Sequence, residues 1–237
     1  MKETIPGSAK YAAIKAKLRE LKLHTGCEEA SCPNLGECWT GGDAGTATAT
    51  VMILGDTCTR GCTFCNVKTL HTPPPPDPNE PSNVAEAISS WGLDYIVITS
   101  FDHDDLPDQG SDHFTETVQM MKAFKPKILI EALGDHSCVE KVAKSGLNVF
   151  AHVIETVESV RTWSAITMLT SNNRLMSLKW QKSMLHLGLL QRHQLCWAVA
   201  KPERVICTME KVRAAGIDVM IFGVLISCIW SCGPIII

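Results

Sequence analysis

The sequence has no apolar run that reaches the roughly 18 residues of a membrane-spanning helix, so we expect no membrane segment. It also has no block of basic residues. Its 22 Lys and Arg stand against 25 Asp and Glu, for a formal charge of −3, and this balance argues against a dedicated nucleic-acid-binding protein. The first residues, Met1 to Pro6, predict neither a signal peptide nor a transit peptide rich in Arg and Ser.

Three common catalytic motifs are missing as well. There is no glycine-rich phosphate loop, no G-x-S-x-G nucleophile elbow and no H-E-x-x-H zinc motif. The composition is that of an ordinary globular protein, with 45% hydrophobic and 20% charged residues, which argues against wholesale disorder. A length of 237 residues fits one large domain or a barrel better than several small domains.

Cysteine is the residue type that stands out, with eleven copies. An odd total without a secretion signal disfavours a disulfide scaffold and favours metal or cluster ligation in a reducing compartment. Five cysteines are scattered and are interpreted mainly as small buried residues: Cys138, Cys196, Cys207, Cys228 and Cys232. The other six lie close together near the amino terminus.

These six cysteines form two triplets. The first triplet is Cys27, Cys32 and Cys38, and the second triplet is Cys58, Cys62 and Cys65. A structural zinc site usually takes four ligands, often as two C-x2-C pairs. Three closely spaced thiolates can instead hold three irons of a [4Fe–4S] cluster and leave the fourth iron open to a small molecule.

The apolar pattern predicts an α/β fold in which buried parallel strands alternate with helices, as a partial (β/α) barrel or a doubly wound sheet. Helices are predicted over 9–23, 82–91 (capped by Ser82 or Asn83), 113–124, 138–144 and 209–215. Strands are predicted over 46–54, 94–99, 127–131, 147–152 and 217–222. Residues 24–45 are predicted to be loop, 73–76 an extended proline connector, and 158–207 show no clear element.

The second triplet, in the string Cys58-Thr-Arg-Gly-Cys-Thr-Phe-Cys65, resembles the C-x3-C-x-aromatic-C loop of radical S-adenosylmethionine (SAM) enzymes. The strings HTGCEEASCPNLGECW and TATATVMILGDTCTRGCTFCNVKT narrow the family, because they resemble lipoyl synthase. The resemblance covers residues 1–157 nearly continuously and returns at 207–223. The string PPPPDPNEP is most like the plant mitochondrial form.

The resemblance implies a radical SAM barrel and a specific chemistry. A [4Fe–4S] cluster on the second triplet would bind SAM, with Phe64, Thr99 and Glu131 as SAM contacts. The resulting radical would abstract hydrogens from C6 and C8 of an octanoyl chain on a protein lysine. An auxiliary [4Fe–4S] cluster on the first triplet would supply the sulfur.

The resemblance also implies partners and a location. The substrates would be octanoylated lipoyl-carrier domains, namely the E2 subunits of 2-oxoacid dehydrogenases and the H protein of glycine cleavage. An electron donor such as ferredoxin would supply electrons, and the mitochondrion, or alternatively the plastid, would be the compartment. We predict three parts: a helix and auxiliary-cluster segment over 1–45, a partial barrel over 46–223 and a non-family tail over 224–237.

Several positions depart from the family pattern. Thr63 and His103 stand where the family usually has Arg. Gly134 follows Leu133 directly, so the Pro-Asp-Phe-Arg-Gly stretch that the family has there is missing. His152-Val153 replaces the family's His-Asn. Codons for 168–176 and 193–202 can spell the family sequence in another frame, so we hypothesise a shifted reading frame within 158–206. We also expect the C-terminal side of the barrel to be incomplete, without the family's Arg-Ser-Ser-Tyr, and the chain alone to be unstable or inactive.

Other interpretations stay open. The chain could be a non-catalytic iron–sulfur or zinc-binding protein, a truncated relic of the family. A biotin-type sulfur inserter is a further possibility, which the x4-x5 spacing of the first triplet argues against. The acidic string around His103, Asp102 to Asp105, is either a metal site or, by preference, a solvated loop. His24 is expected near the first triplet without being a ligand.

Overall fold

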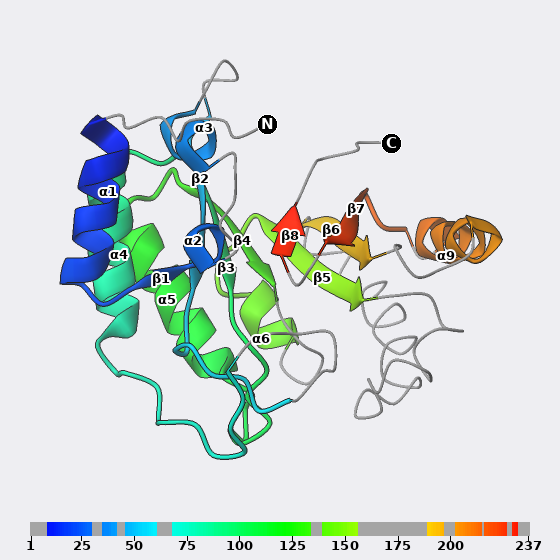
Figure 1. The fold of residues 1–237 in the computed structure, drawn as a ribbon, viewed down its shortest axis with the longest axis horizontal. Coiled ribbons are helices and arrows are strands. Elements are labelled where there is room, and N and C mark those ends of the chain that lie inside the picture. Colours follow the sequence, from blue (N-terminus) through cyan, green and yellow to red (C-terminus); the bar gives the residue numbers. More distant parts are fainter. Residues whose placement is uncertain are drawn as a thin grey trace.

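The fold is an open α/β sheet with its strands in sequence order, seen in a computed structural model of the chain (Figure 1). The structure describes residues 9–29, 35–41, 46–60, 68–133, 139–155, 189–196, 202–214, 216–226 and 229–231. The order β1-β2-β3-β4-β5-β6-β7-β8 places six parallel strands, β2 to β7, in the middle. The outer strands β1 and β8 run antiparallel to their neighbours.

Most of the strands form where the sequence has short apolar or β-branched runs. Their bounds are β1 His24–Thr25, β2 Thr48–Met52, β3 Tyr95–Thr99, β4 Leu129–Leu133, β5 Val149–Glu155, β6 Leu190–Cys196, β7 Val219–Ile226 and β8 Ile229–Ser231. Val51 pairs with Ile98, and Ile98 pairs with Ala132, and all three side chains are fully buried. Continuous apolar runs of this kind suit strands covered on both faces.

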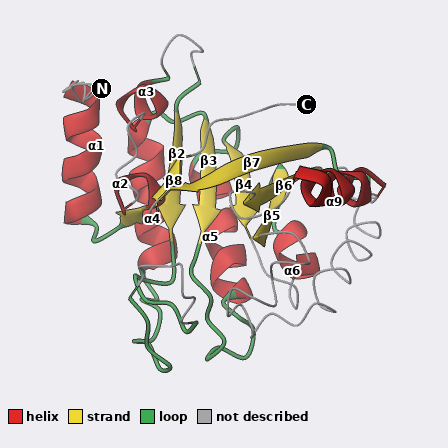
Figure 2. Cartoon of the chain, turned by 45° about the vertical axis from the view of Figure 1, so that its right-hand side comes forward, coloured by secondary structure: helices red, strands yellow, loops and turns green. Residues whose placement is uncertain are grey.

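Four of the described helices, α4, α5, α6 and α9, lie in the connections between parallel strands, whereas α1, α2 and α3 precede β2. Their bounds are α1 Ala9–Glu20, α2 Gly26–Glu29, α3 Leu35–Thr40, α4 Glu80–Trp91, α5 Ser111–Phe124, α6 Val139–Ala143 and α9 Pro202–Ala214. Figure 2 shows α4, α5 and α6 side by side along the sheet, with α1 beyond α4. Their apolar faces supply much of the core, for example Ile14 and Leu18 of α1, Ile88 of α4 and Met121 of α5.

Four predicted details need correction. Residues 24–45 are not all loop, because they hold β1, α2 and α3. Neither Ser82 nor Asn83 caps α4, which begins at Glu80 after Asn79, with Pro81 in the first turn where its missing N–H costs nothing. The helix predicted over 209–215 begins seven residues earlier, at Pro202, and β6 lies in the stretch where no element was predicted.

The predicted fold class is confirmed: the sheet is of the parallel α/β type and, in the part of the chain that the structure describes, it does not close into a complete barrel. No helix among the described residues is long and apolar enough to cross a membrane.

Candidate functional site

The site is built where the parallel strands end, at the carboxyl edge of β2 and β3. The chain leaves β2 toward Cys58, whose side chain is only 8% exposed. The Cys58 N–H donates to the carbonyl oxygen of Lys68 (2.9 Å), and the Leu70 N–H donates to the carbonyl oxygen of Cys58 (3.1 Å). These bonds close the base of the loop that carries the second triplet.

Cys58 has an environment that suits a metal-binding thiolate. The backbone N–H of Arg60 donates to the Cys58 Sγ, with 3.3 Å between nitrogen and sulfur. Hydrogen bonds of this kind stabilise negative charge on a thiolate and tune the potential of an iron–sulfur cluster. The buried sulfur therefore fits the cluster that the sequence resemblance implies.

Arg60 also joins the loop after β2 to the loop after β3. Its Nε and Nη2 donate to the two carboxylate oxygens of Asp104, each at 2.7 Å. Its Nη1 lies 3.2 Å from Oδ1 of Asp102. We call the contact of Arg60 with Asp104 and Asp102 the interloop ion pair. The Arg60 guanidinium, which hydrogen-bonds to Asp104, lowers the pKa of that carboxyl below its usual value.

Thr59 adds a second connection between the same loops. Its N–H and its hydroxyl both donate to the carbonyl oxygen of Asp102, at 3.0 and 2.9 Å. The Asp104 N–H donates to the Thr59 hydroxyl oxygen at 3.0 Å. The two loops therefore form one hydrogen-bonded unit at the edge of the sheet.

The turn at Leu54, just beyond β2, is held by side chains from the first turns of α4 and α5. Leu54 has a positive φ of 66°, which costs a leucine free energy. Its N–H donates to Glu80 Oε2 (2.7 Å), and the same oxygen lies 2.7 Å from Nε2 of His113. Glu80 opens α4 and His113 lies in the first turn of α5, so two helices orient the start of the loop.

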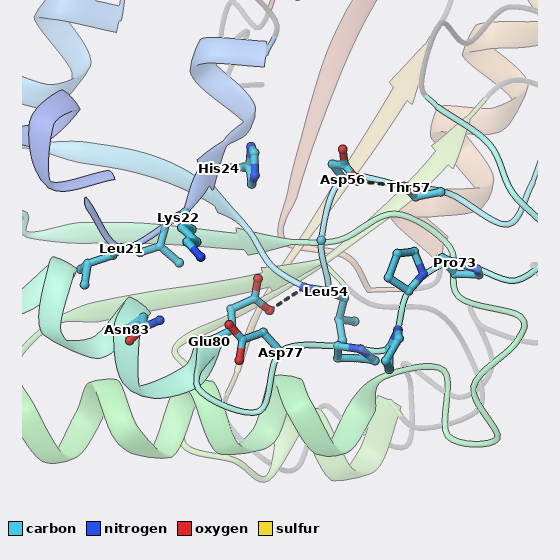
Figure 3. Close-up of a pocket in the computed structure, with 15 residues that line it drawn as sticks. Leu21, Lys22, His24, Leu54, Asp56, Thr57, Pro73, Asp77, Glu80 and Asn83 are labelled. Carbon is cyan, nitrogen blue, oxygen red and sulfur yellow. Dashed lines mark hydrogen bonds between the residues drawn. The ribbon is translucent and has the colours of Figure 1, made fainter. Parts of the chain in front are cut away.

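A pocket of about 190 Å³ lies beside this turn (Figure 3). Its walls are the segment Leu21–His24, the turn Leu54–Thr57, the four prolines 73–76 and the start of α4 with Asp77, Glu80 and Asn83. The pocket mixes the cationic Lys22 with carboxylates. Of the predicted SAM contacts, the two that the structure describes, Thr99 and Glu131, do not line it, and neither does Cys58.

The cysteines of the first triplet lie partly within the described residues. Cys27 is in α2, which packs near β2, since a Cβ on Gly26 would lie 3.4 Å from Cγ2 of Thr50. Cys38 is in α3 and exposed. Cys32, Cys62, Cys65 and Phe64, together with Thr63, Gly134 and residues 158–188, lie outside the described residues.

The other two predicted SAM contacts lie on neighbouring strands. Thr99 ends β3 and is half-buried, and its carbonyl oxygen accepts the N–H of Ile53 (2.9 Å). Glu131 lies in β4 with 1% of its surface exposed, and Tyr95 of β3 donates its hydroxyl to Glu131 Oε2 at 2.5 Å. Whether Thr99 and Glu131 contact SAM stays a prediction.

The acidic string after β3 lies in a partly exposed loop that binds Arg60. In the described part of the chain, no three His, Cys, Asp or Glu side chains are grouped so that they could hold a metal ion. Asp102 and Asp104 instead bind Arg60. His103 is buried, with Nδ1 3.4 Å from Asp105 Oδ1 and no well-formed hydrogen bond. His24 is exposed.

Sequence reasoning missed three side chains that connect the elements around the site: Arg60, Glu80 and Tyr95. Each acts on a partner more than 25 positions away in the chain. The one available signal was the place of Arg60 inside the C-x3-C spacer, next to two expected ligands.

Comparisons with known proteins identify similar sequences. The family model described as the radical SAM superfamily matches residues 52–227, and the model described as the N-terminal domain of lipoyl synthase matches residues 1–32. The chain is 66% identical over 229 residues to "Lipoyl synthase, mitochondrial" of Sorghum bicolor and 63% identical to "Lipoyl synthase 2, mitochondrial" of Pisum sativum. Both matches cover 94% of this chain, and they cover 59% and 61% of those proteins, so the chain spans about three fifths of their length.

Solved structures support the fold. Methylornithine synthase superposes with a TM-score of 0.59 at 15% identity and covers 94% of this chain and 66% of its own. A maturase of the [FeFe]-hydrogenase gives a TM-score of 0.59 at 12% identity and covers 92% of this chain and 55% of its own. At such low identity the likeness concerns the fold alone.

Proposed function

Because the chain belongs to the radical SAM superfamily, we propose that it acts as a lipoyl synthase, which inserts two sulfur atoms at C6 and C8 of an octanoyl chain carried on a protein lysine. One observation carries the proposal: the chain is 63–66% identical to plant lipoyl synthases over 94% of its length. That span includes both cysteine triplets. The chain spans about three fifths of those relatives, so the activity itself is the proposal.

The described residues fit this role at the second triplet. The buried Cys58 would be a ligand of the SAM-binding [4Fe–4S] cluster, together with Cys62 and Cys65. Its sulfur already accepts the Arg60 N–H, and the loop base at Lys68 and Leu70 fixes its backbone. These residues would hold a cluster whose chemistry, when it is bound, would be reductive cleavage of SAM to give the radical that takes hydrogen from the octanoyl chain.

The first triplet would hold the auxiliary [4Fe–4S] cluster that provides sulfur. Its segment lies next to the sheet that carries Cys58, since α2 packs near β2. This arrangement supports a division into an auxiliary-cluster segment over 1–45 and a radical SAM barrel over 46–223. The strand ends would then bring both clusters to one substrate.

The proposal extends to partners and location. We propose octanoylated E2 subunits and the glycine cleavage H protein as carriers, a ferredoxin-type electron donor and the mitochondrion, the compartment in the names of the plant relatives. The alternative of a non-catalytic zinc or iron–sulfur protein finds no support in the comparisons.

The test is anaerobic reconstitution of the purified chain with iron and sulfide. We expect about eight irons per chain, as two [4Fe–4S] clusters require, and a brown absorbance. Cys58→Ala should retain about four irons, from the auxiliary cluster alone. The matched control is Cys207→Ala, which removes an exposed cysteine of α9 outside both triplets and should keep the full content.

The reconstituted chain is then mixed with SAM, a reductant and an octanoylated carrier domain. Mass spectrometry should show two sulfur atoms gained on the carrier with no net loss of hydrogen, because two C–H bonds become two C–SH groups. Oxidation of that dithiol to the disulfide after the assay should then remove two hydrogen atoms. A colourless zinc-bound chain would overturn the proposal. A chain with both clusters that leaves the carrier unchanged would overturn the proposed activity and bear out the sequence-based expectation of an inactive chain.

A further inference from the structure

The strongest feature that the proposed function leaves unused is the interloop ion pair. We propose that Asp104 is a positioning residue for the cluster: it acts through Arg60 to hold the loop of the second triplet in the geometry that retains iron. The inference rests on the proposed function and extends it to a residue outside the cysteine signature.

The contact has the geometry of a strong, orienting interaction. Both bonds from Arg60 to Asp104 measure 2.7 Å and involve two different nitrogens and two different oxygens. Such a bidentate pair fixes orientation as well as distance, and charge-assisted bonds are roughly twice as strong as neutral ones. The Arg60 side chain is only 11% exposed, against 41% for Asp104, so water competes weakly at the guanidinium.

The position of Arg60 makes this contact relevant to the ligands. Arg60 lies between Cys58 and Cys62, inside the C-x3-C spacer. Cys62 follows Arg60 by two residues in the sequence, as Cys58 precedes it by two, so Arg60 is close along the chain to two expected ligands. The base of the loop is fixed separately, by the pairing of Cys58 with Lys68 and Leu70. Asp104 therefore supplies the second fixed point of the loop.

Asp104 is itself held in place, as a positioning residue must be. Its backbone N–H donates to the Thr59 hydroxyl oxygen (3.0 Å), and that hydroxyl donates to the carbonyl oxygen of Asp102 (2.9 Å). The carboxylate thus meets Arg60 without a large loss of conformational freedom. Mutation of a residue that orients a metal ligand in this indirect way typically lowers metal affinity by about 10- to 100-fold.

The ion pair also has an electrostatic consequence. Arg60 places a positive charge within two residues of two ligands, and Asp102 and Asp104 balance it. Removing one carboxylate leaves more of the positive charge uncompensated. A positive charge near a cluster favours its reduced, more negative state, so the midpoint potential should rise.

The experiment compares iron release from the reconstituted chain to a chelator under anaerobic conditions. Asp104→Asn and Arg60→Lys should each release iron roughly tenfold faster from the second-triplet cluster. Lysine keeps the charge of Arg60 but cannot form the bidentate contact. The double variant should release iron no faster than the worse single variant, because both changes break the same pair.

The matched control is Glu86→Gln. It removes a carboxylate from another 2.7 Å ion pair, between Glu86 and Lys17, which joins α4 to α1 and involves neither the loop after β2 nor the loop after β3. This variant should release iron at the wild-type rate. An EPR-monitored redox titration gives the second readout, in which Asp104→Asn should shift the potential upward and Glu86→Gln should not.

The outcomes separate the two levels of the proposal. If the wild-type chain takes up no iron, the proposed function fails. If it does, and Asp104→Asn holds iron and keeps its potential like the wild type, this inference is wrong. Additive effects in the double variant would also contradict it. Asp104→Glu keeps the negative charge on a longer side chain. It serves as the variant that should fold like the wild type, and it should release iron at an intermediate rate.

Discussion

Leu54 shows at the scale of one residue how the site is held. A positive φ costs a leucine about 1–2 kcal/mol, and the hydrogen bond from its N–H to Glu80 offsets part of this. The side chain is buried. It fits against Gly110, whose own φ is 83°. The turn that leads to Cys58 therefore depends on a glycine that lies 56 positions further along the chain.

Gly110→Ala should lower the free energy of unfolding by about 2–3 kcal/mol, because the new Cβ would overlap Leu54 Cδ1 and alanine would adopt a left-handed conformation. The matched control is Gly92→Ala, also at positive φ (63°) but with nothing within 4 Å. It should cost only about 1 kcal/mol. Urea unfolding of the iron-free chain measures both, and equal losses would contradict the overlap.

Asp104 gives a prediction on pH. Its pKa is lowered in the folded chain by its hydrogen bond to Arg60. The stabilisation is therefore fully present above the usual Asp pKa of about 3.9 and is lost as pH falls through the lower folded pKa. The difference in unfolding free energy between wild type and Asp104→Asn, measured on the iron-free chain, should shrink toward acid. A difference that stays constant from neutral pH to pH 2 would show that the ion pair does not stabilise the fold.

At the scale of elements, a polar contact joins β3 to β4. Tyr95 donates its hydroxyl to the buried Glu131. Removing that hydroxyl leaves a buried carboxylate with one hydrogen bond fewer. Tyr95→Phe should therefore destabilise the chain by about 1–3 kcal/mol.

The control for this prediction is Tyr11→Phe, the corresponding change at the second tyrosine of the sequence. Tyr11 is half-buried and stacks on Trp39 with ring centroids 5.4 Å apart, a contact that phenylalanine retains. Tyr11→Phe should lower the stability of the chain less than Tyr95→Phe. Thermal unfolding followed by circular dichroism compares the two, and an equal loss of stability would contradict a special role for the cross-strand bond.

The elements that sequence could predict are those with a strong local pattern. The strands at 95–99 and 129–133 are apolar because both faces are buried, and the amphipathic helices α4 and α5 show a clear period. Helices α2 and α3 are too short for a period to show. Strand β6 has four polar residues among seven and forms because β5 and β7 pair with it on both sides.

The site was predictable to the same limited extent. The spacing of Cys58, Cys62 and Cys65 is local information, so the sequence alone indicates the ligands. The contact of Arg60 with Asp104 joins residues 44 positions apart, across a parallel crossover. Neither a period nor a spacing encodes it, and it emerges only when β2 and β3 lie side by side.

At the scale of the whole molecule, the question is whether the sheet beyond β5 belongs to the same folding unit as the site. Gln194 of β6 pairs with Val153 on one side and Ile221 on the other. Proline at this position removes a ladder hydrogen bond and should cost about 3 kcal/mol. If the six parallel strands unfold together, Gln194→Pro lowers the single midpoint of the entire chain.

Thr72→Pro is the matched control, because Thr72 is exposed and precedes the proline run at 73–76, where an extended backbone is already required. It should leave the midpoint nearly unchanged. Gln194→Pro could instead unfold in two separate steps, with the step that involves the first triplet and β2 keeping the wild-type midpoint. That result would show that the C-terminal strands form an independent unit.

The sequential strand order has a consequence for synthesis. Every strand from β2 onward hydrogen-bonds to the strand made just before it, so each new strand leaving the ribosome meets an edge that is already in place. Among the strands that the structure describes, none has to be inserted between two that have already paired. The sheet can grow in the direction of translation, and the contacts between the loops after β2 and β3 can form once the first 104 residues are out, while the rest of the chain is still being made.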